Sequence, residues 1–279
     1  MFRIEDLAHI LQSMRAQWRL AQRTTVEEFA DYLVDSFGWE ACAFSFPHGP
    51  RTIVYARERT SVLEILKRLR PNSYFSHYTA MQLHALTEQV PKAIYLTEER
   101  SRAVDSLEVE AKQDEMTQAD IDAAFSRPPR TSSNSVIFRG MRIYLLQGAG
   151  TDRAGVQAME ADHEQTRQRI HVEASDVERT LIDATVRPFY SGGVGEVAAA
   201  FVEAKERVSV NRIRALLTQM RMIYPCHQAI GWYLERAGFR PAQLALLQSM
   251  PMTLDFYLAH QMTKPRYIKN WRLFVPQDF

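Results

Sequence analysis

The segment SDVERTLIDATVRPFYSGGVGEV, residues 175–197, constrains the fold more than any other stretch of this 279-residue chain. Ser175 and Glu178 have the spacing of a capping box, in which each side chain caps a backbone N–H at the start of a helix. The apolar residues then recur at helical spacing, at Val177, Leu181, Ile182 and Val186. This pattern predicts a helix with one face buried in a hydrophobic core.

The end of this helix is marked as clearly as its start. Pro188 lacks a backbone N–H, so it interrupts the helical hydrogen bonds. Gly192 and Gly193 then let the backbone turn into a second helix, because glycine tolerates positive φ angles that other residues avoid. The segment therefore predicts two successive helices joined by a short turn.

Three charged residues of the first helix, Glu178, Arg179 and Asp183, are candidates for a structural or a reactive role. Arg179 and Asp183 are four residues apart, so they can pair along the helix or be held by partners across the domain. The helix that contains them has a continuous buried stripe. We therefore predict that all three residues maintain the fold.

The amino-terminal residues combine helical and strand-like patterns. Apolar residues recur at helical spacing over 4–18 and over 26–37, and two strand-like runs follow at 41–46 and 51–56. Helices followed by a hairpin are the order of a winged helix, so we predict a winged-helix-like DNA-binding module over residues 1–60. No well-separated third helix precedes the hairpin, which leaves open a small helical cap packed on the main domain.

Basic side chains cluster at two places near this end of the chain. Arg15, Arg19 and Arg23 follow one another at steps of four, so a continuous helix would place them on one face. The second cluster lies in a predicted helix that opens at Ser61. Basic side chains bind the phosphates of DNA. We predict phosphate contacts from seven residues: Arg15, Arg19, Arg23, Arg51, Lys67, Arg68 and Arg70.

The remaining residues, 61–279, predict a helix-rich domain with a small sheet, so the whole chain belongs to the mixed α/β (α+β) class. Ser76 is expected to cap a helix in this domain. The expected strands lie at 92–97, 135–139, 141–146, 169–174 and 271–276, and residues 175–262 are mostly helical. Residues 98–130 show weak periodicity and an excess of acidic over basic side chains, which predicts a solvated, mobile insertion with a short helix near 119–125.

Composition limits the partners that the chain can bind. The net charge is only +1, so a DNA-binding surface must be a local patch balanced by acidic residues elsewhere. No stretch approaches the roughly 20 apolar residues that span a bilayer, and the start of the sequence lacks a basic-then-apolar signal segment. We therefore expect a cytoplasmic protein without a membrane partner. Two cysteines, Cys42 and Cys226, cannot form a dense disulfide scaffold.

Three segments together resemble one protein family. They are FSHYTAMQLHAL at 75–86, the segment at 175–197, and YPCHQAIGWYLERAGF at 224–239, which is followed by TLDFYLAHQM and NWRLFVP. The second is the most specific, with Ser-x-x-Glu-Arg-Thr-Leu-Ile-Asp, a proline and a glycine pair. The chain resembles the AbiEi family, the antitoxin and repressor halves of type IV (abortive infection) toxin–antitoxin systems, which act in phage defence.

This resemblance implies a transcriptional regulator that represses its own operon. Its partners would be operator DNA and a co-encoded nucleotidyltransferase-like toxin, which it counteracts with or without a stable complex. The family motif falls on six residues here: Ser76, Glu178, Arg179, Asp183, Gly192 and Gly193. No cofactor and no metal are implied.

Enzymatic alternatives rest on weaker patterns. His77 and His84 are seven positions apart on one predicted helix, about 10 Å along its axis, which is too far to share a metal ion. A run at 160–169 with Asp162, His163 and Glu164 is typical of a solvated helix face, and Gly192 and Gly193 match no phosphate-loop motif. We therefore expect no enzyme. Two alternatives stay open: a defence-associated protein that acts only through protein contacts, and a nucleotide-processing enzyme.

Overall fold

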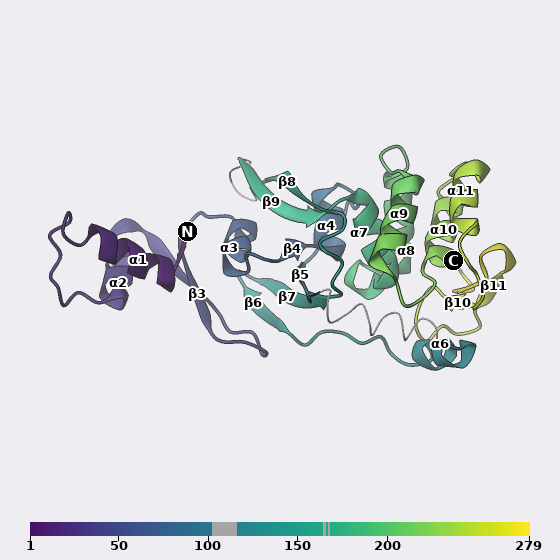
Figure 1. Cartoon of the computed structure of the whole chain (residues 1–279), viewed down its shortest axis with the longest axis horizontal. Helices are drawn as coiled ribbons and strands as arrows, with labels where there is room; N and C mark the ends of the chain where they lie inside the picture. Colours follow the sequence, from purple (N-terminus) through teal and green to yellow (C-terminus); the bar gives the residue numbers. More distant parts are fainter. Residues whose placement is uncertain (102–115, 164–165, 167) are drawn as a thin grey trace.

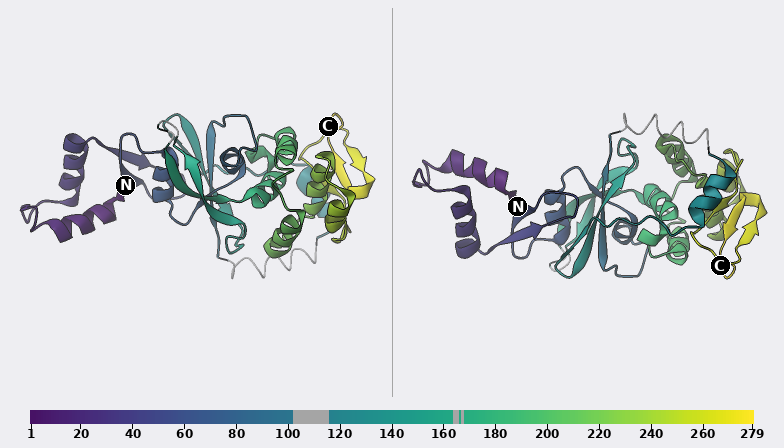
Figure 2. Two further views of the ribbon diagram at one scale, coloured as in Figure 1. Left: turned by 90° about the horizontal axis from the view of Figure 1, so that it is seen from above. Right: turned by 90° about the horizontal axis from the view of Figure 1, so that it is seen from below.

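The computed structural model describes residues 1–101, 116–163, 166 and 168–279. Within these ranges the chain is a mixed α+β protein with ten α-helices and three sheets, which confirms the predicted class. The molecule is elongated, with the amino-terminal residues at one end and the carboxy-terminal helices and strands at the other (Figure 1, Figure 2). None of the helices in the described ranges is long and apolar enough to cross a bilayer.

The first 60 residues form two helices and an antiparallel sheet with strand order β1-β3-β2. In chain order the elements are β1 (Phe2–Arg3), α1 (Ile4–Met14), α2 (Val26–Phe37), β2 (Trp39–Phe44) and β3 (Thr52–Arg57). Thr25 and Glu28 form a capping box at the start of α2, with backbone N–H to side-chain distances of 3.1 and 2.9 Å. Gly38, with a φ of 65°, ends that helix.

The predicted helical face of Arg15, Arg19 and Arg23 is wrong, because α1 ends one residue before Arg15. The Arg15 guanidinium donates hydrogen bonds to the carbonyl oxygens of Gln22 (3.0 Å) and Thr24 (2.9 Å), which holds this stretch as a loop. Arg19 has a φ of 54°, in the left-handed region that a continuing helix excludes. The three arginines therefore lie on a loop between α1 and α2.

The hairpin β2–β3 confirms the predicted hairpin, but the winged helix is not confirmed. Residues 1–60 are all described, and only two helices precede the hairpin, with none between α2 and β2 to serve as a recognition helix. Part of the hairpin packs on α1 and α2, whereas five of its side chains lie in the core of the larger domain: Cys42, Phe44, Phe46, Val54 and Ala56. The amino-terminal module thus shares a core with the rest of the chain.

A six-stranded mixed sheet forms the middle of the molecule, in the order β6-β7-β5-β4-β9-β8 (Figure 1). Its strands are β4 (Tyr74–Phe75), β5 (Ala93–Glu99), β6 (Ser135–Phe138), β7 (Met141–Gly148), β8 (Val156–Asp162) and β9 (Arg169–Ser175). Ile94 and Leu96 of β5 pack in the same core as helix α3 (Val62–Leu69) and the hairpin. Tyr95 lies between them in the strand and packs against Tyr190 in a separate cluster.

Strand β8 corrects the prediction of a solvated helix face at 160–169. Asp162 pairs with Arg169 across an antiparallel hairpin, and Val156 at its other end pairs with Ser175. β8 is an edge strand with several charged or exposed side chains, so its hydrophobic alternation is weak. Its hydrogen bonds to β9 stabilise it, and the sequence pattern of β8 does not show this pairing. Glu164 lies outside the described residues.

The second half of the chain is mostly helical. It contains α7 (Val177–Val186), the 3₁₀ turn η1 (Pro188–Tyr190), α8 (Val194–Glu203), α9 (Val210–Met220), α10 (His227–Arg236) and α11 (Pro241–Gln248). Leu181 and Ile182 are fully buried in its core, as predicted. The last residues form a small sheet, β10 (Phe256–Tyr257), β12 (Leu273–Val275) and β11 (Arg266–Ile268), with the 3₁₀ turn η2 (Lys269–Trp271).

The stretch 98–130, for which mobility stays a prediction, contains secondary structure in its described residues. Glu99 ends strand β5, and helix α6 (Gln118–Phe125) packs against the carboxy-terminal sheet (Figure 1). Ile121 of α6 is fully buried, and the Phe125 ring stacks on His260 at a centroid distance of 4.5 Å. Residues 102–115 of this stretch lie outside the described ranges. Helix α6 confirms the short helix expected near 119–125, whereas its packing could not be predicted from the sequence because α6 buries only one side chain completely.

Candidate functional site

The start of α7 is held by more partners than the sequence predicted. Asp176, rather than Ser175, is the N-cap, and its carboxylate accepts a hydrogen bond from the Arg179 backbone N–H at 2.8 Å. The Ser175 hydroxyl instead lies 2.8 Å from that of Thr180. Glu178 accepts the backbone N–H of Ser209 at 2.9 Å, so it joins α7 to the start of α9. The predicted capping box is therefore wrong, but the contacts of Glu178 hold the fold.

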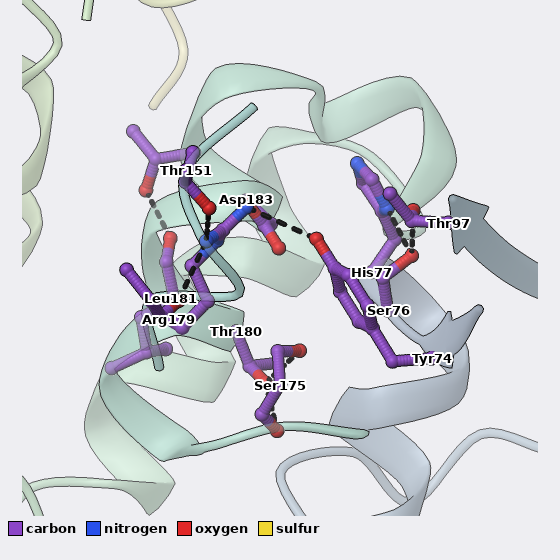
Figure 3. Close-up of polar contacts among 12 residues, drawn as sticks. Tyr74, Ser76, His77, Thr97, Thr151, Ser175, Arg179, Thr180, Leu181 and Asp183 are labelled. Carbon is purple, nitrogen blue, oxygen red and sulfur yellow. Dashed lines mark hydrogen bonds and ion pairs between the residues drawn. The ribbon is translucent and has the colours of Figure 1, made fainter. Parts of the chain in front are cut away.

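Arg179 lies at the centre of a buried polar network (Figure 3). Its side chain is only 4% exposed. The guanidinium donates to the Asp183 carboxylate (2.9 Å), the Ala154 carbonyl (2.7 Å), and the hydroxyls of Thr151 and Tyr74 (3.1 Å each). One side chain thus joins α7, β4 and the loop between β7 and β8.

Glu99 supplies a second carboxylate to the same network. It lies 3.7 Å from Arg179 and accepts hydrogen bonds from Tyr74, from Thr151 and from the backbone N–H of Arg153. Burial by itself lowers the pKa of Arg179, but the carboxylates of Asp183 and Glu99 outweigh burial and raise that pKa above its ordinary value. Arg179 therefore stays charged, and its charge is balanced inside the protein.

Ser76 belongs to a neighbouring group of buried polar side chains (Figure 3). Helix α4 (His77–Leu83) begins after Ser76, but the Ser76 side chain makes no capping hydrogen bond. Its hydroxyl lies 2.7 Å from the Thr97 hydroxyl and 2.8 Å from Nδ1 of His77. Burial, followed by the charges of Arg187 and Arg179, lowers the pKa of His77 well below its ordinary value. Ser76 is therefore the N-cap residue of α4, as predicted, but without a capping side-chain hydrogen bond, and Ser76 and His77 are buried.

The glycine pair has the backbone geometry that the sequence predicted. Gly192 and Gly193 have φ angles of 80° and 93°, and Gly193 is the N-cap of α8. A side chain at Gly192 would collide with Glu196 and Tyr78. These two positions therefore require glycine for the turn from η1 into α8.

Four of the seven predicted DNA-binding residues have their side chains engaged within the protein. Arg15 holds its own loop, as described above. Lys67 donates to the carbonyls of Pro71 (2.7 Å) and Ser73 (3.1 Å) and pairs with Glu173. Arg68 pairs with Asp6 of α1, and Arg70 lies over the Phe46 ring at 5.8 Å. For a phosphate to bind these side chains, it would have to compete with existing partners.

The other three, Arg19, Arg23 and Arg51, are exposed and make no side-chain hydrogen bond or ion pair with another described residue. Their surroundings are acidic. Residues 1–60 contain seven basic and eight acidic residues, a net charge of −1. Helix α2, which lies between the arginine loop and the hairpin, contains four acidic residues and no basic one: Glu27, Glu28, Asp31 and Asp35.

The described residues contain no group of three or more His, Cys, Asp and Glu side chains that could hold a metal ion. His77 and His84 lie at opposite ends of α4. Cys42 and Cys226 are free and buried, and burial raises the pKa of Cys42 to about 11 and that of Cys226 to about 12. Both thiols therefore remain protonated near neutral pH.

Comparison with known proteins adds evidence on the fold alone. No family model and no curated protein matches the chain. A solved structure described as the crystal structure of the RV2827C protein from Mycobacterium tuberculosis is similar, with a TM-score of 0.55 and 13% sequence identity. The match covers 98% of this chain and 85% of that chain. The elongated α+β arrangement thus occurs in a second protein of very different sequence.

Proposed function

We propose that this protein is an AbiEi-type antitoxin and autorepressor, a cytoplasmic, non-enzymatic regulator of a toxin–antitoxin operon. One observation supports this proposal more than any other. The three segments on which the resemblance rests pack together, since Met81, Leu181 and Ile230 share one core. Arg179 also donates to Tyr74, which directly precedes the first segment. The motif residues therefore act together as a framework, as the signature of a shared domain would.

In this proposal the amino-terminal module contacts operator DNA through Arg19, Arg23 and Arg51. These are the predicted residues whose guanidinium groups are free to bind phosphate. A short arginine set of this kind neutralises phosphates without discriminating between bases. The acidic helix α2 would repel the DNA backbone, so the loop with Arg19 and Arg23 would make the main contact, and Arg51 would make a separate one from the hairpin.

A second function, action through protein contacts alone, is favoured by the same acidic helix. Tyr32 and Phe37 of α2 are 56% and 59% exposed, and their rings contact each other edge to face at 5.5 Å. Exposed aromatic side chains among acidic ones are more typical of a protein interface than of a DNA-binding helix. In this alternative the co-encoded toxin is the partner and the operator is not.

Binding of the intact protein to its own upstream DNA tests the proposal. We expect binding that weakens steeply with salt, because its contacts are with phosphates, together with restored growth when the protein is co-expressed with the neighbouring toxin gene. Arg142→Ala serves as a control, because Arg142 is an exposed arginine of the central sheet. Restored growth without salt-sensitive DNA binding would replace the proposal with the protein-contact alternative. Deleting residues 1–58 is a poorer test, because it would open the shared core.

A further inference from the structure

The positive charge of this protein is concentrated at the end opposite the amino-terminal module. Residues 206–279 contain ten basic and four acidic residues, a net charge of +6, whereas the whole chain has +1. Eight of the ten are arginines. These residues occupy α9 to α11 and the small carboxy-terminal sheet, at the far end of the molecule (Figure 1, Figure 2).

Three of these basic side chains lie close together on and beside strand β11. Lys264, Arg266 and Lys269 are all exposed, and none forms an ion pair with a described carboxylate. Tyr267, between them, is 42% exposed. β11 is an edge strand that pairs only with β12 within the described residues. The segment therefore presents basic and aromatic side chains along one open edge.

A fourth basic side chain adjoins this edge from helix α10. The Arg266 guanidinium donates to the Phe279 carbonyl at 2.9 Å, and the Arg236 guanidinium lies 5.0 Å from the centre of the Phe279 ring. Arg236 also lies 5.2 Å from the Trp232 ring. Arg236 and Arg266 therefore both contact Phe279, and the ring contacts restrain Arg236 without neutralising its charge.

The neighbouring carboxylates are mostly engaged in the fold. Asp255 accepts hydrogen bonds from Arg272 (2.7 Å) and Tyr267 (2.8 Å), and Glu235 accepts the Trp271 indole N–H at 2.5 Å. Asp278 is the exposed acidic residue nearest in sequence to Phe279. Arg272 balances the charge of Asp255, whereas Glu235, bonded to the neutral Trp271 indole, and Asp278 keep theirs. The four cations therefore outnumber two carboxylates, which favours a polyanion as the ligand.

We propose that Arg236, Lys264, Arg266 and Lys269, here called the β11 surface, bind the phosphate backbone of duplex DNA. The choice of DNA as the ligand rests on the proposed function. The site itself does not, because the β11 surface lies at the other end of the molecule from Arg19 and Arg23. Guanidinium groups match the oxygen geometry of phosphate, and the lysines add charge. The contact would be insensitive to base sequence and would add to operator binding by the amino-terminal module.

The test compares three variants of the full chain on a duplex of unrelated sequence over a range of salt concentrations. They are a β11 variant (Lys264→Ala, Arg266→Ala, Lys269→Ala), a control with the same loss of charge on the central sheet (Lys92→Ala, Arg142→Ala, Arg169→Ala), and an amino-terminal variant (Arg19→Ala, Arg23→Ala, Arg51→Ala). Each lost phosphate contact should make the slope of the logarithm of the binding constant against the logarithm of the salt concentration less steep by about 0.9. We expect this slope to become less steep by about 2 to 3 in the β11 variant and to stay unchanged in the control.

The charge-conserving variant Lys264→Arg, Lys269→Arg should keep the wild-type salt dependence, and a urea unfolding curve checks that each variant folds. If the β11 variant binds as the control does while the amino-terminal variant is weakened, the β11 surface is refuted and the proposed function stands. If the wild-type protein binds no duplex, both fail. A third outcome is possible: the protein self-associates in a salt-sensitive way, and the β11 substitutions abolish this self-association without changing DNA binding. The β11 surface would then bind the acidic helix α2 of a second copy and not DNA.

Discussion

The core of the larger domain and the amino-terminal module use arginine in opposite ways. Arg179 donates to four partners, is 4% exposed and faces two carboxylates. Arg19, on the loop of the module, is exposed, and its side chain contacts no described partner. The difference separates cations that the fold uses from cations that remain available to a ligand. The motif residues belong to the first kind, so their presence supports a shared domain more directly than a shared activity.

The largest effect is expected from Arg179→Met. The substitution would leave Asp183 and Glu99 buried without their cation, so the free energy of unfolding should fall by about 3–5 kcal/mol. Chemical denaturation at neutral pH measures the loss.

Arg169→Met is the control for this substitution. Arg169 pairs with Asp162 and Glu160, and all three side chains are more than half exposed, so the loss should be below about 1 kcal/mol. Equal losses in the two variants would contradict the distinction between a buried network and a surface ion pair.

Leu181→Ala tests the core on which the network rests. Leu181 is fully buried beside Ile182, and removing it should cost about 2–5 kcal/mol. Val202→Ala in α8 is a suitable control, since Val202 is more than half exposed. If Leu181→Ala lost less than 1 kcal/mol in the denaturation curve, the position of the core would be wrong.

Stability should also fall in acid. Burial lowers the pKa of His227 to about 4, below the ordinary 6.5, so the unfolded chain binds a proton more readily than the folded one. The contribution of this residue is complete above about pH 6.5 and is lost as the pH falls towards 4, an effect of about 3 kcal/mol. Denaturation curves at several pH values should show a shallower pH dependence for His227→Gln. An unchanged dependence in that variant would exclude His227 as the source.

Local signals in the sequence predicted the elements well. Ser61 and the glycine pair mark helix starts, and the structure confirms both. Only part of the polar network could be predicted from the sequence. Arg179 and Asp183 are four residues apart on one helix, whereas Glu99 lies 80 residues earlier in the chain. No local pattern assigns a glutamate at the end of a strand to a buried arginine.

The prediction of the basic surfaces failed for a related reason. Spacing alone placed Arg15, Arg19 and Arg23 on one helix face, but the side chain of Arg15 binds backbone carbonyls and ends the helix there. Lys67 and Arg68 looked like surface cations, yet each has a carboxylate partner from a distant element. Charge along a sequence does not reveal which charges the fold has already paired.

The central claim is that cations paired with a carboxylate in the fold do not bind phosphate, and salt-dependent DNA binding of two double variants tests it most directly. Arg19→Ala, Arg23→Ala and Lys67→Ala, Arg68→Ala remove the same charge, the first pair from the loop between α1 and α2 and the second from α3. We predict that the first pair flattens the log–log salt dependence by about 0.9 for each lost contact and leaves stability unchanged. The second pair should leave the salt dependence as it is and lower stability slightly. A flattening confined to the second pair would contradict the account.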